Sequence, residues 1–170
     1  MRMRSPSVLF GLALLTSTVT HADPATPPAA AAKPKETPMT QHATGTFKVD
    51  LVPLTVNESV ADDLRARMSI NKTFSGDLEA RSVGEMLTAG TPTRGSAAYV
   101  AIERVTGTLH GRSGAFSLQH TGVMNRGTPS LDVTIVPDSG SGELEGIVGT
   151  LAIIIADGKH SYDLAYTLSR

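Results

Sequence analysis

Residues 99–124 read YVAIERVTGTLHGRSGAFSLQHTGVM, and apolar and polar side chains alternate over most of this stretch. A period of two predicts a pair of antiparallel strands, which we expect to turn near Arg112 and Ser113. The residue numbers of paired partners then sum to 225, which sets Leu109 opposite Phe116. A loop with an odd number of residues would put the two apolar rows on opposite faces, so the hydrophobic pattern selects a register in which they share one.

Two polar side chains interrupt the apolar rows of this hairpin. Glu103 falls in the row of the first strand, and His120 falls in the row of the second. In the expected register Val105 faces His120, which leaves Glu103 diagonal to His120 and within reach. A carboxylate beside a histidine can orient the imidazole and raise its basicity, as a general base requires. The alternative is a structural carboxylate paired with Arg104, Lys72 or a backbone donor.

The same alternation dominates the chain from Thr44 onward, and no window shows the stripe of an amphipathic helix. We therefore predict an all-β fold of about seven or eight strands. Pro53 weakens any continuation of the first strand, because proline cannot donate to a ladder. Residues 59–67 fit either a loop or one helical turn. The other expected strands cover residues 46–51, 67–75, 77–88, 131–135, 150–155 and 159–168.

Asp157 and Gly158 form the strongest short hairpin signal in the chain. Partner numbers across this turn sum to 315, so Ile153 faces Tyr162 in a dense apolar and aromatic row. A sheet of this size hides its edges in a barrel or a sandwich. We favour a barrel, because a dry sandwich core would have to satisfy each inward polar group separately. These inward polar groups are Lys72, Glu103, His120, Tyr162 and Tyr166.

The N-terminus differs in composition from the rest of the chain. Two arginines among the first four residues precede an apolar run over residues 8–19, and Ala22 is a small residue at the expected cleavage point. This layout is typical of a secretory signal peptide over residues 1–22, and the run is shorter than the roughly 20 apolar residues of a membrane span. Residues 23–38 predict a disordered Pro/Ala linker. We expect a periplasmic or secreted protein, without a stable membrane span after cleavage, whose barrel domain covers residues 39–170.

Composition also excludes several classes of function. The chain has no cysteine, which rules out disulfides, thiolate catalysis and cysteine-ligated metals. A formal net charge of −1, without a basic run interleaved with aromatic residues, argues against nucleic acid as a partner. No His or carboxylate spacing matches a zinc motif, so we expect no metal and no other cofactor. Residues 140–146 match neither a nucleophile elbow nor a dinucleotide fingerprint.

Longer motifs resemble one known family over nearly all of the expected folded region. Besides the hairpin, they are MTQHATGTF from Met39, VPDSGSGELEG from Val136 and DGKHSY from Asp157. Together they closely resemble the bacterial domain of unknown function 3224 family. That family is similar in fold to the allene oxide cyclase and dirigent group, which implies an antiparallel β-barrel of about eight strands around an apolar cavity. No catalytic residue of the cyclases maps onto this chain, so the resemblance implies no reaction.

We predict that this barrel binds a small, largely apolar molecule in its lumen. Polar side chains on the inward rows would orient the molecule. His110 and His160 fall at turn ends, where we expect them to be exposed. The candidate ligand-binding residues are Glu103, His120, Tyr99, Lys72, Tyr162 and Tyr166.

Two alternatives stay open at the level of sequence. In the first, the protein is a cofactor-free isomerase or cyclase: His120 moves a proton, Glu103 orients it, and a tyrosine or Lys72 stabilises oxyanion charge. In the second, the protein is an interaction module. Its outer face would then form a homo-oligomer interface. That face carries Val100, Ile102 and Val123.

Overall fold

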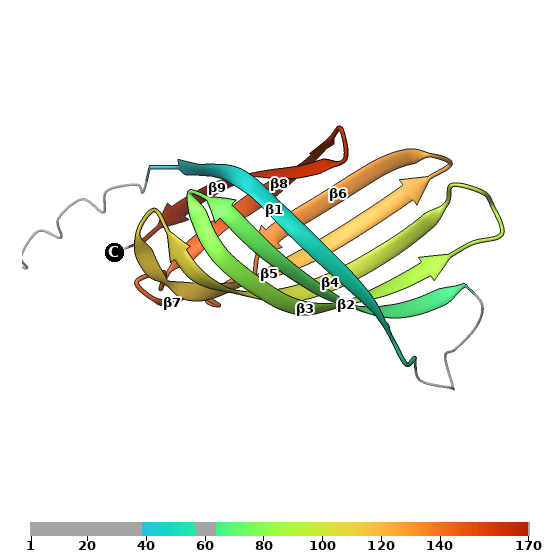
Figure 1. Cartoon of the computed structure of the whole chain (residues 1–170), viewed down its shortest axis with the longest axis horizontal. Coiled ribbons are helices and arrows are strands. Elements are labelled where there is room, and N and C mark those ends of the chain that lie inside the picture. Colours follow the sequence, from blue (N-terminus) through green and yellow to red (C-terminus); the bar gives the residue numbers. More distant parts are fainter. Residues whose placement is uncertain (1–38, 57–63, 170) are drawn as a thin grey trace, which may run out of the picture. The chain divides into compact units, whose positions relative to one another are not determined.

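Eight long antiparallel strands close into a barrel in the computed structural model of the chain (Figure 1), which describes residues 39–56 and 64–169. The strands follow one another around the barrel in chain order, and the pairing of the first with the last completes the ring. They are β1 (Gln41–Leu54), β2 (Arg65–Gly76), β3 (Leu78–Gly90), β4 (Ala97–Leu109), β5 (Arg112–Asn125), β6 (Thr128–Ile135), β8 (Ile147–Ala156) and β9 (Lys159–Leu168). A two-residue strand, β7 (Ser141–Gly142), pairs with β5.

The predicted all-β barrel of about eight strands is thus confirmed. The expected signal peptide over residues 1–22 and the expected linker over residues 23–38 lie outside the described residues. So does most of the segment 59–67, which the sequence left open between a loop and a helical turn. Within the described ranges, no helix has the length and hydrophobicity to cross a membrane.

The register predicted for the hairpin of β4 and β5 was wrong. Partner numbers sum to 221 instead of 225, and Val105 faces Phe116. The reason is the turn, which uses His110 and Gly111 with φ angles of 47° and 77°. Positive φ at both central residues fits the right-handed twist of the flanking strands, and histidine tolerates this region better than most side chains. The backbone N–H of His110 also donates to the carbonyl oxygen of Asp77 at 2.9 Å, which holds the turn in place.

The side-chain faces of the hairpin are nevertheless those predicted, because the sum stays odd. Ala101 faces His120 and Glu103 faces Leu118, so Glu103 and His120 remain a diagonal pair on one face. The second hairpin has the predicted register, with Ile153 opposite Tyr162 across the Asp157–Gly158 turn.

The first strand runs further than its proline suggested. β1 continues through Pro53 to Leu54 and pairs with β2 from Gly45 to Leu54. Its pairing with β9 has already ended at Phe47, which faces His160. Pro53 therefore lies where β1 has a ladder on one side alone, and a missing N–H is tolerated there.

The two ends of the barrel interior differ. The end that holds the β2–β3 and β4–β5 turns is filled by a cluster of fully buried apolar side chains, among them Leu78, Leu109, Phe116 and Leu164. The opposite end holds the β3–β4 loop and the β5–β6 and β8–β9 turns. A cavity occupies this second end, and it is where the polar side chains singled out by the sequence converge.

Candidate functional site

The cavity has a volume of about 470 Å³ and mainly apolar walls. Its lining comes from β1, β2, β3, β4, β5, β6, β8 and β9, so every long strand contributes. The walls include Val49, Ile70, Met86, Leu131 and Ile153. Titratable side chains interrupt this apolar surface at Lys72, Tyr99, His120 and His160, and hydroxyl groups do so at Thr88 and Ser130.

Glu103 is the centre of a buried cluster behind the cavity wall. Its side chain is fully buried, and its Oε1 accepts a hydrogen bond from Nζ of Lys72 at 2.5 Å. Its Oε2 accepts a second from the Ser82 hydroxyl, also at 2.5 Å. Nε2 of His120 lies 2.6 Å from Oε1. Four neighbouring strands, β2 to β5, each supply one member of this cluster.

The inward alternation of each strand explains this convergence. Lys72 and Ser82 are register partners on β2 and β3, and Glu103 follows on β4. Glu103 faces Gly84 of β3, which lacks a side chain, so the carboxylate can extend across β3 toward β2. A Cβ on Gly84 would lie 2.1 Å from the Ile102 carbonyl oxygen, which shows how closely β3 and β4 approach here.

The carboxylate of Glu103 is held in its charged form. Burial raises its pKa, but the contact with His120 and the charge of Lys72 outweigh burial and lower the pKa from 4.5 to about 2. Two buried charges without partners would cost several kcal/mol, so the Lys72–Glu103 pair is viable because each charge compensates the other. Lys72 also lies 5.2 Å from the centre of the Phe47 ring, a favourable cation–π distance.

His120 connects this cluster to the cavity. The ring lines the cavity, whereas Glu103 lies behind it. Although Nε2 is close to Oε1 of Glu103, the ring N–H does not point along this contact. Nε2 is thus a buried side-chain nitrogen without an aligned hydrogen bond among the described residues. Buried polar atoms without an aligned partner are uncommon in proteins, which makes His120 a candidate functional residue.

Tyr99 forms the neighbouring part of the wall. It faces Gly122 across the β4–β5 ladder, and a Cβ on Gly122 would lie 2.1 Å from Cε1 of the Tyr99 ring. The ring therefore lies over the glycine, as aromatic side chains do when they cover a glycine in a sheet. Burial and the negative charge of Glu103 both raise the pKa of Tyr99, so its hydroxyl keeps its proton.

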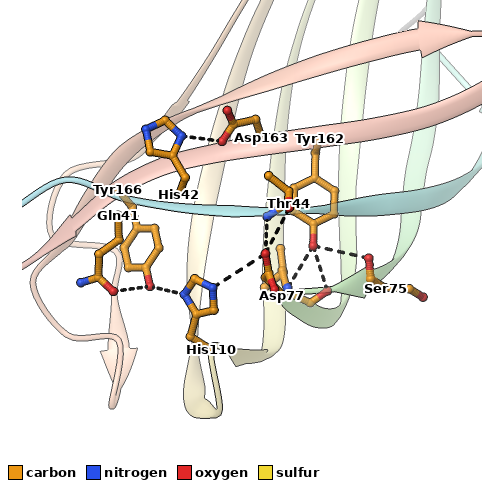
Figure 2. Close-up of polar contacts among 10 residues, drawn as sticks. Gln41, His42, Thr44, Ser75, Asp77, His110, Tyr162, Asp163 and Tyr166 are labelled. Carbon is orange, nitrogen blue, oxygen red and sulfur yellow. Dashed lines mark hydrogen bonds and ion pairs between the residues drawn. The ribbon is translucent and has the colours of Figure 1, made fainter.

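The other two candidate tyrosines lie at the filled end of the barrel, beside the β2–β3 and β4–β5 turns (Figure 2). Neither of them lines the cavity. The hydroxyl of Tyr162 accepts a hydrogen bond from the backbone N–H of Leu78 at 2.9 Å. The hydroxyl of Tyr166 lies 2.8 Å from Nδ1 of His110 and 3.1 Å from Oε1 of Gln41. Their hydroxyls tie strands and turns together at this end.

Sequence reasoning missed two residues of the site. Ser82 has no chemical signature of its own, although it shares the inward parity of Ala80 and Gly84 on β3. His160 was expected to be exposed at a turn end, but it is half-buried, lines the cavity and lies 5.1 Å from the Phe47 ring centre. Its register position, two residues before the inward Tyr162, already indicated an inward side chain.

The structure also bears on possible metal ligands and on the outer face of β4 and β5. Within residues 39–56 and 64–169, no group of three His, Asp or Glu side chains converges as metal ligands do. Val100, Ile102 and Val123 lie on the outside of β4 and β5 with roughly half of each side chain exposed, at 52%, 53% and 46%.

Comparisons with known proteins agree with this architecture. A search of curated proteins found no match. A crystal structure of a protein of unknown function from the DUF3224 family of Shewanella oneidensis MR-1 is 46% identical in sequence to this chain, with a TM-score of 0.73. The match covers 78% of this chain and 99% of that one. The family described as "Protein of unknown function (DUF3224)" matches residues 43–166, and the chain therefore belongs to the DUF3224 family.

Proposed function

We propose that the barrel binds a small, mainly apolar molecule in the cavity at the end that holds the β5–β6 and β8–β9 turns. The supporting observation is the combination of about 470 Å³ of space and mainly apolar walls with a few inward polar side chains, among them Lys72, Tyr99 and His120. Ligand sites in proteins typically have volumes of about 300–1,000 Å³ and a few polar groups that fix orientation.

The polar residues have different parts in this proposal. His120, Tyr99 and Lys72 contact the ligand, because they line the cavity. Glu103 and Ser82 are positioning residues, since they hold Lys72 and His120 from behind. Tyr162 and Tyr166 stabilise the filled end and have no contact with the ligand.

A cavity-filling variant with a matched control tests the proposal. Ile153 lines the cavity, whereas its neighbour Ile154 is exposed on the outside. Ile153→Trp should abolish binding of the uncharged dye Nile red, and Ile154→Trp should leave it unchanged. Native mass spectrometry of protein purified from its host should show a retained small molecule in wild type and Ile154→Trp alone. Equal dye binding by both variants, or none by wild type, would refute the cavity as a binding site.

The Glu103–His120 contact favours a second candidate, a cofactor-free isomerase. A carboxylate behind an imidazole that faces a cavity is an arrangement suited to proton transfer. If the protein is an isomerase, the retained molecule incubated with wild-type protein in deuterium oxide should gain deuterium at carbon, and His120→Gln should prevent this. A ligand that binds without any such exchange identifies a carrier.

A further inference from the structure

The charges around the cavity narrow the class of ligand, a step that rests on the proposed function. Among the described residues, the lining contains one Lys or Arg side chain, Lys72, two histidines, His120 and His160, and no Asp or Glu. The Lys72 ammonium group is already compensated by Glu103 at 2.5 Å. An ionised ligand buried here would bring a charge without a partner, which is costly in an apolar site. The cavity therefore favours an uncharged ligand.

The contact with Glu103 also fixes which nitrogen of His120 carries the proton. A lone pair on Nε2 only 2.6 Å from a carboxylate oxygen would be repelled, so Nε2 is protonated. In the neutral ring Nδ1 is then an acceptor. Nδ1 has no hydrogen bond to any described residue, and the ring lines the cavity. His120 therefore offers the ligand an acceptor.

Tyr99 offers a donor beside this acceptor. Ala101 faces His120 and Tyr99 faces Gly122, so the Tyr99 and His120 side chains are diagonal neighbours on the inner wall. The phenol keeps its proton, because burial and the charge of Glu103 both disfavour ionisation. One side of the cavity thus pairs an acceptor with a donor, and the rest of the lining is mainly apolar apart from Lys72, Thr88, Ser130 and His160.

We infer that the ligand is an uncharged, mainly apolar alcohol or phenol, whose hydroxyl group lies between His120 and Tyr99. The ligand hydroxyl donates to Nδ1 of His120 and accepts from the Tyr99 hydroxyl. A ketone or ether would accept from Tyr99 and leave Nδ1 unpaired. A carboxylate would add a charge that Lys72 cannot balance while it is bound to Glu103. A hydroxyl group satisfies both neighbours without charge.

Three probes with the same apolar body test this inference near neutral pH: 2-naphthol, naphthalene and 2-naphthoate. The chain has no tryptophan, so naphthalene-type fluorescence can be followed without tryptophan background, and calorimetry checks each affinity. We expect 2-naphthol to bind the full chain about tenfold more tightly than the other two, the gain of one or two added hydrogen bonds.

The variant Glu103→Gln should reverse the preference. It leaves the Lys72 charge without a counter-ion beside the cavity, so 2-naphthoate should bind more tightly than 2-naphthol. Because the readout is a ratio within one variant, a general loss of stability cannot produce it. Glu85→Gln, which alters an exposed carboxylate bound to Arg67, should keep the wild-type order. In the charge-neutral double variant Lys72→Met/Glu103→Gln, the advantage of 2-naphthol over naphthalene should be smaller than in wild type, because His120 is no longer held in one tautomer while Tyr99 still donates.

The outcomes separate the two proposals. If naphthalene or 2-naphthoate binds wild type as tightly as 2-naphthol, the hydroxyl inference is overturned while the cavity remains a binding site. If Glu103→Gln keeps the wild-type order, the charge argument is overturned. If none of the three probes binds, the proposed function fails, and the inference fails with it.

Discussion

At the scale of single residues, the buried Glu103 carboxylate is the feature with the widest consequences. It accepts hydrogen bonds from Lys72 and Ser82 and contacts His120, and all four side chains are nearly or fully buried. Each member of such a cluster depends on the others, because the loss of one leaves a buried charge or polar atom unpaired.

The pH dependence of stability should reflect this carboxylate. Its pKa is about 2 in the folded barrel against 4.5 when unperturbed, so its stabilisation is complete above pH 4.5 and is lost as the pH falls from 4.5 toward 2. The shift corresponds to roughly 3 kcal/mol. Urea unfolding at pH 7 and pH 3 should show a smaller acid-induced loss in Glu103→Gln than in wild type. Glu85→Gln serves as the control, because exposed ion pairs contribute little to the free energy of unfolding. If Glu103→Gln loses as much stability between pH 7 and pH 3 as wild type does, the prediction is contradicted.

Gly122 and Tyr99 should behave as a coupled pair. The three atoms nearest to a Cβ added at Gly122 all belong to the Tyr99 ring, so Gly122→Ala must displace that ring. We expect a loss of about 1–3 kcal/mol in the free energy of unfolding, together with altered Nile red affinity. In the background of Tyr99→Ala the same substitution should cost about 1 kcal/mol less, measured by a double-mutant cycle. Strictly additive effects would show that the ring is not what Gly122 accommodates.

At the scale of elements, the filled end of the barrel is held by tyrosine hydroxyls that reach from β9 to distant turns. Figure 2 shows Tyr162 beside the β2–β3 turn, and Tyr166 between Gln41 of β1 and His110 of the β4–β5 turn. The partners differ in exposure: Leu78 is 1% exposed, whereas the His110 side chain is 37% exposed.

This difference in exposure predicts that Tyr162→Phe and Tyr166→Phe lower the free energy of unfolding by different amounts. Tyr162→Phe removes an acceptor from the buried N–H of Leu78 and should lower the free energy of unfolding by about 1–3 kcal/mol. Tyr166→Phe should cost less than about 1 kcal/mol, because water can replace the hydroxyl at His110 and Gln41. Urea denaturation measures both, and a larger loss in Tyr166→Phe would refute the assignment.

Strand parity explains how much of the site could be predicted from the sequence. Alternation alone placed Glu103 and His120 on one inner face, and this held even though the register was wrong by four. The error came from the turn, since His110–Gly111 is a less common type I′ pair than Asp157–Gly158. The sequence offered Lys72 as one of several partners of Glu103, but strand parity alone could not select this contact. It joins β2 to β4 across an intervening strand, and it depends on barrel curvature and on the small inward residues Ser82 and Gly84.

At the scale of the whole molecule, neighbouring strands of the barrel differ widely in how many residues they pair. β3 and β4 pair over thirteen residues of each strand, from Leu78↔Leu109 to Gly90↔Ala97, whereas β6 and β8 share a single matched pair, Thr134↔Thr150. Both β6 and β8 line the cavity, through Leu131 and Ile153 among others. The β6–β8 interface, which has the fewest paired residues in the ring and is called the seam below, therefore borders the proposed ligand site.

Hydrogen exchange should locate this seam. Amides of β6 and β8 that face each other have few ladder partners, so peptides from these strands should lose protection earlier than peptides from β3 and β4. A bound ligand should slow exchange in β6 and β8 more than elsewhere. Uniform protection around the barrel, measured by mass spectrometry, would show that the seam is as stable as the other interfaces.

Export is a separate proposal, based on the composition of residues 1–22. Expressed in full in a Gram-negative host, the chain should be recovered from the periplasm with an intact mass that begins at Asp23. Replacing apolar residues of the run 8–19 by charged ones should leave the uncleaved chain in the cytoplasm. Uncleaved wild-type protein in the cytoplasm would refute the proposal.

The pairing of β1 with β9 determines when synthesis can yield a finished barrel. His42 contacts Asp163, 121 positions later, so the two strands meet only after almost the whole domain has been translated. Until then the growing chain exposes the free edge of β1, which is open to pairing with other chains. A chain that ends before residue 159 lacks β9 and therefore has two unpaired strand edges, one on β1 and one on β8. We expect such truncated chains to aggregate, even though they contain most of the domain's sequence.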